Sequence, residues 1–585
     1  MLGQTSYTVS FPNPNGHLAK VVATFSGSFS KDAVVLLPVW TPGSYLIRDY
    51  AKNVEQFTAK DAAGKDLLVS KANKSGWLVA HGGQPFSVSY VVYLNELAVR
   101  NGHVDASHAF FTPATLLVYM QELMGQAHKV TIEPLPTWTS TSTALPALLG
   151  TANTFLANDY DHLADSPFEI GSHKEQAFLA DGVAYRLAMY NASKPFAAAQ
   201  LDSMKRVVMA ANSIFLKDAS GKVLGAMPIK EYLFIIHQTP QGGGGLEHGA
   251  SSVLQARVDF TDDGDEFFGF LSLLAHEYFH IWNVKRIKPK NLGPFNYQEE
   301  NYSTALWFAE GFTSYYEELI LNRAGLMTPD VAIANMGAIY NNIANSVGAR
   351  YHTLEQASQE AWIKFYKPNE NSQNSTTSYY TQGSYLALAT ELYIRSKTGG
   401  ARCLNDLMRS IWASAQASPT FSVDRESFSS ALAALLAGQV PEAEVRAWVA
   451  GAVASTTPPD VLGLAKACGI AAADANAGKA TTTPFAGMGS SWQQDKIMVT
   501  NIRRGGPAEA AGLSFQDVIF TIDDVPVRSP FDALAYKVGQ ELRIGFVRFG
   551  RPRSTTLRLG SLPYVAYAFV LPAKASKQLK GWLIK

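Results

Sequence analysis

The chain has 585 residues, with 49 basic and 49 acidic side chains, 47% hydrophobic residues and two cysteines. At about 150 residues per domain this length predicts three to four domains, and the composition excludes a small disulfide scaffold and a disordered chain. Because the formal net charge is zero, no long-range field attracts nucleic acid or an anionic membrane surface. We therefore expect no nucleic-acid partner and a function that resides in a local site.

The compartment is left open by the sequence. The most apolar segment, residues 267–282, contains His276, Glu277 and His280, so we expect no membrane span. The N-terminus lacks a basic region followed by an apolar one, which favours a cytoplasmic location for the chain as given. A periplasmic or secreted location stays open, because a removed signal peptide leaves no trace.

The chain changes character along its length. Up to about residue 179, short runs rich in Val, Thr, Phe and Tyr alternate with Pro, Gly, Asn and Asp clusters, which predicts a mostly antiparallel β domain. Further strands follow up to residue 260, and helical spacing of apolar residues then continues to about residue 477. We predict an α+β multidomain chain with a β-rich, sandwich-like N-terminal domain, a region that becomes helical, a β-rich module and a tail, over residues 1–170, 171–477, 478–560 and 561–585.

The first strongly helical segment contains an H-E-x-x-H pattern, formed by His276, Glu277 and His280. Residues four apart share one face of a helix, so both imidazoles can reach one ion at about 2.0–2.1 Å. Glu277 can take a proton from water whose pKa the metal lowers. A chance match on a buried helix is the alternative, but His-Glu-His is costly to desolvate between apolar flanks. We predict one Zn²⁺ per chain.

Two residues compete for the third zinc ligand. Glu299 follows His280 by 19 residues, but it lies in a polar, loop-like stretch. Glu310 follows by 30 residues and lies in a segment with helical periodicity and bulky apolar flanks. Because a packed helix holds a ligand more rigidly than a loop does, we select Glu310 and expect Glu299 to be solvated.

Together, HEYFHIWNVKRIKP and LWFAEGFTSYY resemble the glycyl aminopeptidase family, relatives of aminopeptidase N among the zinc peptidases that use two His and one Glu. In that group the third ligand sits in a W-x-x-E-G-F helix, which residues 307–312 match with Glu310. The resemblance implies a thermolysin-like catalytic domain with a helical subdomain over residues 171–477. It also implies an insertion before that helix relative to aminopeptidase N, which explains why the shorter spacing falls on Glu299.

Two further segments match the family's motifs. Aminopeptidase N relatives carry a G-x-M-E-N strand whose Glu binds the substrate's α-amino group, and residues 244–248, GGLEH, are similar with Leu for Met and His for Asn. The resemblance implies that Glu247 binds the ammonium, that Gly245 lets the peptide backbone approach, and that His248 contacts the substrate. A flexible glycine loop with solvated side chains is the alternative.

Relatives also carry Y-x-x-G before a helix, and their Tyr hydrogen-bonds the oxyanion of the tetrahedral intermediate. Tyr380 matches that position, where a phenol donor would stabilise developing negative charge. Without the resemblance, a tyrosine before a helix is more often simply packed. Tyr379 is the neighbour that competes for the role.

The C-terminal block resembles a PDZ domain over residues 502–513 and 516–519, which read as a strand, a Pro-Ala helix, a Gly-Leu turn and a D-V-I strand. Residues 487–489 would supply the loop whose backbone N–H groups receive a chain-terminal carboxylate. Two roles stay open for this module: binding the C-terminus of a peptide partner, or packing within the chain.

We therefore predict a zinc aminopeptidase acting on peptides with a free N-terminus, and the resemblance implies small N-terminal residues such as Gly or Ala. One alternative is a zinc endopeptidase whose PDZ module selects substrates. The other is a PDZ interaction protein with a non-catalytic metal site.

Overall fold

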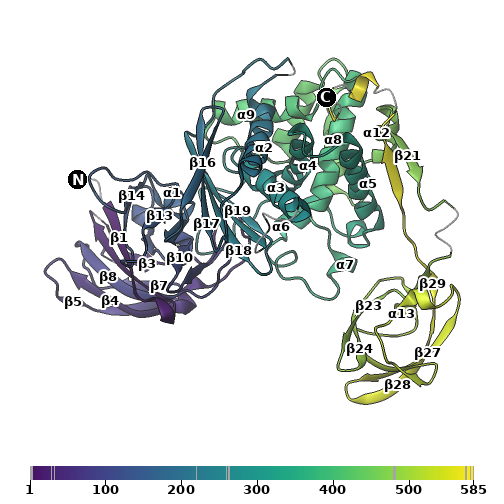
Figure 1. Ribbon diagram of the computed structural model, residues 1–585, viewed down its shortest axis with the longest axis horizontal. Helices are drawn as coiled ribbons and strands as arrows, with labels where there is room; N and C mark the ends of the chain where they lie inside the picture. The colour runs from purple at the N-terminus through teal and green to yellow at the C-terminus, as the bar shows by residue number, and fades with distance from the viewer. Residues whose placement is uncertain are drawn as a thin grey trace. The chain divides into compact units, whose positions relative to one another are not determined.

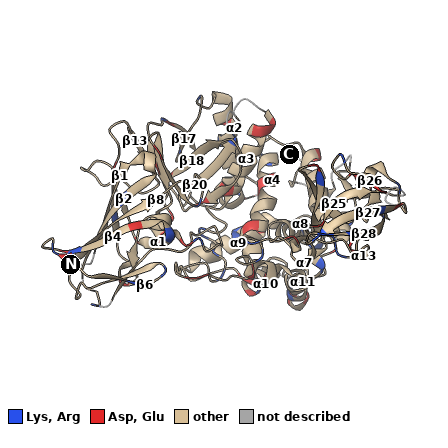
Figure 2. Ribbon diagram, turned by 90° about the horizontal axis from the view of Figure 1, so that it is seen from below, with Lys and Arg blue, Asp and Glu red and all other residues tan. Residues whose placement is uncertain are grey.

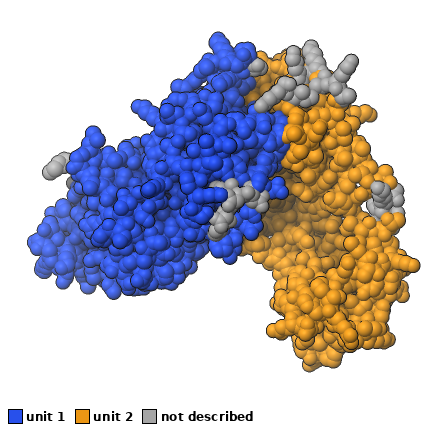
Figure 3. Space-filling model, viewed as in Figure 1, with its two compact units in different colours: residues 1–303, 316–327, 408–423 blue, residues 304–315, 328–407, 424–585 orange. Residues whose placement is uncertain are grey.

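The structure is a computed structural model that describes residues 4–27, 29–31, 33–218, 220–257, 260, 264–477, 482–572, 576–579 and 581–583. The chain forms two compact units, which Figure 3 colours separately. The first unit comprises Met1–Ser303, Tyr316–Met327 and Met408–Val423. The second comprises Thr304–Tyr315, Thr328–Leu407 and Asp424–Lys585.

The first unit begins with a β-rich domain, as the sequence predicts. Its largest sheet has seven strands in the order β14-β12-β1-β2-β8-β4-β5, drawn in purple and blue in Figure 1. Buried and more exposed residues alternate along β2 and β8, the period-two pattern of a strand with one face in the core. The strands are β1 (Gln4–Asn13), β2 (Leu18–Ser26), β4 (Val54–Asp61), β5 (Asp66–Leu67), β8 (Phe86–Tyr93), β12 (His128–Glu133) and β14 (Thr154–Ala157).

Two four-stranded sheets, β13-β15-β10-β9 and β11-β3-β7-β6, complete this domain. Their residues join those of the seven-stranded sheet in one hydrophobic core rich in aromatic side chains. Helix α1 (Tyr160–Ala164) lies between β14 and β15 in the chain. The strands are β3 (Val34–Leu36), β6 (Val69–Asn73), β7 (Gly76–Val79), β9 (Gly102–Val104), β10 (His108–Phe111), β11 (Tyr119–Met120), β13 (Ser140–Ser142) and β15 (Phe168–Gly171).

A five-stranded sheet follows, in the order β16-β17-β18-β20-β19. Its three central strands are parallel, and β18 is buried from Tyr232 to Gln238, as expected for a strand covered on both faces. The edge strand β19 is short and antiparallel to β20. The strands are β16 (Glu175–Ala180), β17 (Val183–Tyr190), β18 (Glu231–Thr239), β19 (Gly245–Glu247) and β20 (Ser251–Arg257).

Helices α2 (Ala198–Leu216) and α3 (Gly264–Phe279) pack on this sheet and on each other. The hydroxyl of Tyr278 in α3 donates to Oδ1 of Asn212 in α2 at 2.7 Å and lies 2.7 Å from the hydroxyl of Tyr185 in β17. These buried hydrogen bonds fix the rotation of α3 about its axis, and with it the direction in which the H-E-x-x-H side chains point.

The second unit is predominantly helical, as predicted for the region that precedes residue 477. Its central helix α8 is buried from Gln382 to Arg395. The π-helical segment η6 (Trp307–Phe312) packs on the start of α8, where a Cβ on Gly311 would lie 2.3 Å from the Cα of Gly383. Only glycine permits this approach. The α-helices between residues 313 and 467 are α4 (Thr313–Arg323), α5 (Pro329–Asn345), α6 (Leu354–Gln359), α7 (Ser372–Ser375), α8 (Thr381–Thr398), α9 (Leu404–Ala417), α10 (Arg425–Leu435), α11 (Glu442–Ala454) and α12 (Val461–Ala467).

The C-terminal module has a six-stranded antiparallel sheet with its own hydrophobic core. The expected start of this module, at residue 478, falls within residues 478–481, which lie outside the described residues. The segment expected to be a tail contains β30 (Tyr567–Val570), which pairs with β21 (Ala471–Asp474). The remaining elements are β22 (Pro484–Phe485), β23 (Met488–Gln493), β24 (Lys496–Ile502), α13 (Pro507–Ala510), β25 (Val518–Ile522), β26 (Val525–Pro526), β27 (Glu541–Arg548), β28 (Arg551–Arg558) and β29 (Gly560–Ser561).

Within the described ranges, no helix combines the length and the apolar character needed to cross a membrane. Basic and acidic residues are interspersed along the chain (Figure 2), in keeping with its balanced charge.

Candidate active site

Helix α3 carries the H-E-x-x-H pattern at its C-terminal end. The helix ends at Phe279, so His280 lies in the turn that follows it rather than on the helix itself. The rings of His276 and His280 nevertheless lie 4.9 Å apart, centroid to centroid. The expected pairing of these two histidines is therefore present.

The second nitrogen of each imidazole fixes its tautomer. Nδ1 of His276 lies 2.9 Å from Oε2 of Glu317, and Nδ1 of His280 lies 2.7 Å from the backbone oxygen of Asn283. A carboxylate and a carbonyl only accept hydrogen bonds, so both Nδ1 atoms donate. Both Nε2 atoms consequently keep a lone pair, which is the form of histidine that binds a metal ion.

Glu317 is itself held in place. Its other oxygen, Oε1, accepts a hydrogen bond from the hydroxyl of Ser272 at 2.8 Å, one turn before His276. Sequence reasoning did not identify Glu317. The sequence signal that could have indicated Glu317 is its position seven residues after Glu310, a spacing that places two side chains on the same face of an α-helix.

Two buried carboxylates adjoin the histidines. Ligand atoms of Glu247, Glu277 and His280 lie within 4.8 Å of one another, and all three side chains are at most 6% exposed. Two carboxylates placed this close in a buried site favour a bound cation or a shared proton. This juxtaposition brings the predicted amine-binding residue next to the predicted general base.

Glycines allow the backbone to approach these carboxylates. A Cβ on Gly245 in β19 would lie 2.2 Å from Oε1 of Glu277. A Cβ on Gly43, in a loop of the N-terminal domain, would lie 2.9 Å from Oε2 of Glu247. Gly43 also has a φ of 87°, a conformation that favours glycine. The N-terminal domain thus contributes to the site, which sequence reasoning did not foresee.

A cavity of about 330 Å³ adjoins Glu247, and its walls include Tyr45, Asp165 and Lys285. Asp165 accepts hydrogen bonds from Lys285 Nζ at 2.7 Å and pairs with Nδ1 of His248 at 3.0 Å. Burial raises the pKa of Asp165, but Lys285 and the hydrogen bond with His248 outweigh it and hold that pKa well below its usual range. Burial lowers the pKa of Lys285, but Asp165 and Glu247 raise it above its usual value overall. The pair is therefore ionised near neutral pH.

Three of the residues considered for the site belong to the second unit. Glu310 is 2% exposed in η6, whose aromatic residues Trp307 and Phe312 pack on Phe428. Tyr380 caps the N-terminus of α8 and is half-buried, whereas Tyr379 is fully buried. In the first unit, the competing ligand Glu299 is exposed and accepts a hydrogen bond from Asn296.

A helix and the turn that follows it present two histidines in the metal-binding tautomer beside a buried glutamate, which defines a metallopeptidase-like site. Two family models match the chain: the peptidase M61 N-terminal domain over residues 6–172 and the M61 glycyl aminopeptidase over residues 269–386. Over these residues the chain matches the M61 glycyl aminopeptidase family, which confirms the resemblance drawn from its motifs.

Solved structures provide a second comparison. The chain is similar to an aminopeptidase N family protein from Idiomarina loihiensis, with a TM-score of 0.87, 26% identity, and 99% of this chain and 100% of that chain covered. An M1 zinc metallopeptidase from Deinococcus radiodurans has a TM-score of 0.48 and 12% identity over 78% of this chain and 94% of that one. A mutant of that enzyme bound to a Tyr-Ser-Ala substrate has a TM-score of 0.48 and 13% identity, with 78% and 95% covered. Comparison with curated proteins gives no match.

Proposed function

We propose that this protein is a zinc aminopeptidase that removes small N-terminal residues such as Gly or Ala from peptides, with one catalytic Zn²⁺ per chain. The observation that carries the proposal is the pair of imidazoles whose Nδ1 atoms are committed to acceptors, beside the buried carboxylates of Glu277 and Glu247. The family match supports the same reaction class.

The donor set fits zinc. Nε2 of His276 and Nε2 of His280 would hold the ion, and we assign the third position to Glu310, in its buried W-x-x-E-G-F segment. Two neutral imidazoles and one carboxylate are the ligands of catalytic zinc in several peptidases. When bound, Zn²⁺ acts as a Lewis acid that polarises the peptide carbonyl and acidifies water.

Glu277 acts as the general base in this proposal. It takes a proton from the attacking water, a new C–O bond forms at the peptide carbonyl carbon, and the C–N bond breaks as Glu277 passes the proton to the leaving amine.

Glu247 makes the site an exopeptidase by binding the substrate's α-ammonium. Asp165 holds Lys285 in an ion pair at 2.7 Å beside this carboxylate. Gly245 leaves room for the peptide backbone beside Glu277. His248, which pairs with Asp165, contacts the substrate next to Glu247.

Tyr380 stabilises the oxyanion through its phenol. Between the two neighbouring tyrosines, the half-buried Tyr380 is the better candidate, because Tyr379 is 0% exposed and held among aromatic rings.

We also propose that the C-terminal module is a PDZ domain that receives the C-terminus of a peptide. Strand β23 pairs only with β24 among the described strands, which leaves an edge to which an extended peptide can add. Gly487 has a φ of 71°, as a tight turn before such an edge requires. The N–H of Gly489 already donates to Oδ1 of Asn501 at 3.1 Å, so the carboxylate would be received by the earlier residues of the loop.

The main experiment measures hydrolysis of Gly and Ala anilides together with the zinc content of each protein. Wild type should be active with zinc bound, and Glu277→Gln should lose activity while keeping zinc and fold. Glu247→Ala should lose activity towards substrates with a free amine. An inactive, zinc-free wild type would refute the proposal and favour an interaction protein.

A further inference from the structure

A second cluster of histidine and carboxylate side chains lies in the N-terminal domain, away from the H-E-x-x-H helix. His103 is the middle residue of β9, His108 begins β10, and Asp105 lies in the turn between these paired strands. Ligand atoms of the three residues lie within 4.8 Å of one another. We propose that His103, Asp105 and His108 bind a second Zn²⁺ ion that has no part in peptide hydrolysis.

The turn holds the carboxylate in place. Oδ1 of Asp105 accepts hydrogen bonds from the backbone N–H of Ser107 at 2.7 Å, from the Ser107 hydroxyl at 2.6 Å and from the backbone N–H of His108 at 3.1 Å. All three bonds go to the same oxygen. The carboxylate is therefore oriented by one oxygen while the other is left for a cation.

The carboxylate of Glu169 sets the tautomer of His108. Its Oε1 lies 2.8 Å from Nδ1 of His108, and its Oε2 lies 2.9 Å from Nε2 of His237. Glu169 is fully buried between these two rings. A carboxylate only accepts, so Nδ1 of His108 donates and, in the neutral ring, Nε2 carries the lone pair. A carboxylate behind a histidine is the usual support for a metal ligand.

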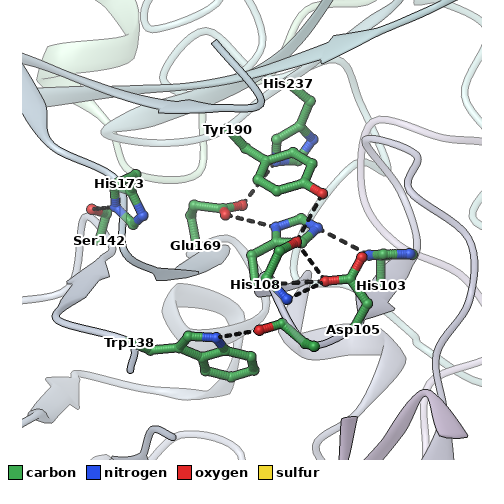
Figure 4. Close-up of polar contacts among 11 residues, drawn as sticks. His103, Asp105, His108, Trp138, Ser142, Glu169, His173, Tyr190 and His237 are labelled. Atoms are coloured by element: carbon green, nitrogen blue, oxygen red, sulfur yellow. Dashed lines mark hydrogen bonds and ion pairs between the residues drawn. The ribbon is translucent and has the colours of Figure 1, made fainter. Parts of the chain in front are cut away.

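The lone pair of His108 faces the other histidine. Figure 4 shows the chain of contacts from His103 through His108 and Glu169 to His237. Nε2 of His108 and Nδ1 of His103 lie 3.0 Å apart, and two nitrogens at this separation can both contact one ion at about 2.1 Å. In its neutral form His103 can also offer a lone pair at Nδ1.

Tyr190 holds the ring of His108 without covering the ring edge that carries the nitrogen atoms. Tyr190 stacks on it with 3.4 Å between ring centroids and 9° between planes, and the Tyr190 hydroxyl lies 3.1 Å from that of Ser107. Stacking covers a face of the imidazole, whereas the nitrogen lone pair lies in the ring plane. Two imidazoles and one carboxylate suit Zn²⁺ rather than Mg²⁺ or Ca²⁺, which prefer oxygen ligands.

The ion would stabilise the junction of two sheets. Glu169 belongs to β15 beside β10, whereas His237 belongs to β18 of the five-stranded sheet. A metal ion that fixes His108 also fixes the buried contacts from His108 through Glu169 to His237. Bound Zn²⁺ should therefore raise the melting temperature of the full chain, because a ligand that binds only the folded state stabilises it.

The test counts ions in metal-stripped full-length protein titrated with Zn²⁺. Wild type should bind about two ions per chain, and His108→Ala about one, with unchanged anilide hydrolysis at saturating Zn²⁺. The double variant His276→Ala/His280→Ala lacks the catalytic site and should still bind about one Zn²⁺ ion. Adding His108→Ala to this double variant should abolish the remaining Zn²⁺ binding. Asp105→Asn keeps an acceptor oxygen for the hydrogen bonds of the turn but removes the carboxylate charge, and it should weaken the remaining site at least about tenfold.

His173→Ala is the matched control, since His173 lies near Glu169 and hydrogen-bonds Ser142 but is no member of the ligand group. His173→Ala should leave the number of bound Zn²⁺ ions unchanged, both in the wild type and in the His276→Ala/His280→Ala variant. A folded His276→Ala/His280→Ala protein that binds no Zn²⁺ would overturn the second site without touching the proposed catalytic function. If that variant does not fold, the zinc content of the wild type decides. One ion per chain in the wild type overturns the proposal. Two ions in the wild type, with one of them lost in His108→Ala, support it.

Discussion

Nδ1 of His276 lies 2.9 Å from Oε2 of Glu317, a residue 41 positions further along the chain. Together with the contact between His280 and the backbone oxygen of Asn283, this bond determines which nitrogen of each histidine is available to a metal. The metal-binding form of the site is thus built by residues outside the H-E-x-x-H motif.

Replacing Glu317 should weaken zinc binding. Glu317→Ala removes the acceptor that orients His276, and loss of such a partner typically lowers metal affinity by about 10- to 100-fold. Glu317→Gln keeps an acceptor oxygen without the charge and should lie between Ala and wild type. Competition with a chelator measures the affinity, and Glu318→Gln is the neighbouring control. Equal zinc affinity in all four proteins would show that Glu317 does not support the site.

Adding a methyl group at Gly43 should impair substrate binding. Gly43→Ala places a Cβ 2.6 Å from Cδ1 of Leu246 and 2.9 Å from Oε2 of Glu247, so Glu247 must move. We expect KM for Gly anilide to rise more than about tenfold, on the scale of 1.4 kcal/mol per decade. Gly64→Ala is a matched control, because Gly64 has a similar φ of 85° with nothing within 4 Å. Both variants should lose stability from backbone strain, and a similar KM for both would contradict the prediction.

Gly245→Ala should act on the catalytic rate. Its Cβ would lie 2.2 Å from Oε1 of Glu277, so the proposed base must shift, and we expect kcat to fall at least about tenfold with zinc content unchanged. Gly269→Ala in helix α3 meets no atom within 4 Å and should keep wild-type kcat. An unchanged kcat in Gly245→Ala would argue against the role of Glu277.

The pair Asp165 and Lys285 should give a defined pH dependence of stability. The pKa of Asp165 is depressed, since Lys285 and His248 outweigh the effect of burial. A depressed carboxyl pKa contributes stability above the unfolded value near 4, and this stability is lost as the pH falls through the folded value.

Asp165→Asn should therefore cost about 3–5 kcal/mol of unfolding free energy at both pH 7 and pH 5, because it leaves Lys285 without its partner. The cost should shrink below about pH 4, as denaturant unfolding at several pH values can show. Asp66→Asn is the control, because its ion pair with Lys60 is exposed and such pairs contribute little. A cost that grows on acidification would contradict the assignment.

Local patterns predicted the fold class well, because period-two and helical spacings are properties of short segments. The two histidines and Glu277 were visible for the same reason. Glu317, Gly43 and Asp165 were not, since each acts on a residue that only the tertiary fold brings near. The expectation that both histidines lie on the helix was wrong for His280, which lies in the following turn, where its ring is fixed by the backbone oxygen of Asn283.

The central claim is that this site recognises a free N-terminus through Glu247. The direct measurement is kcat/KM of the zinc-loaded wild type for Gly anilide and for its N-acetyl derivative. We expect acetylation to lower kcat/KM at least about a thousandfold, because the buried Glu247 loses its ammonium partner. Equal hydrolysis of the two substrates would contradict an aminopeptidase and indicate an endopeptidase that uses the same histidines.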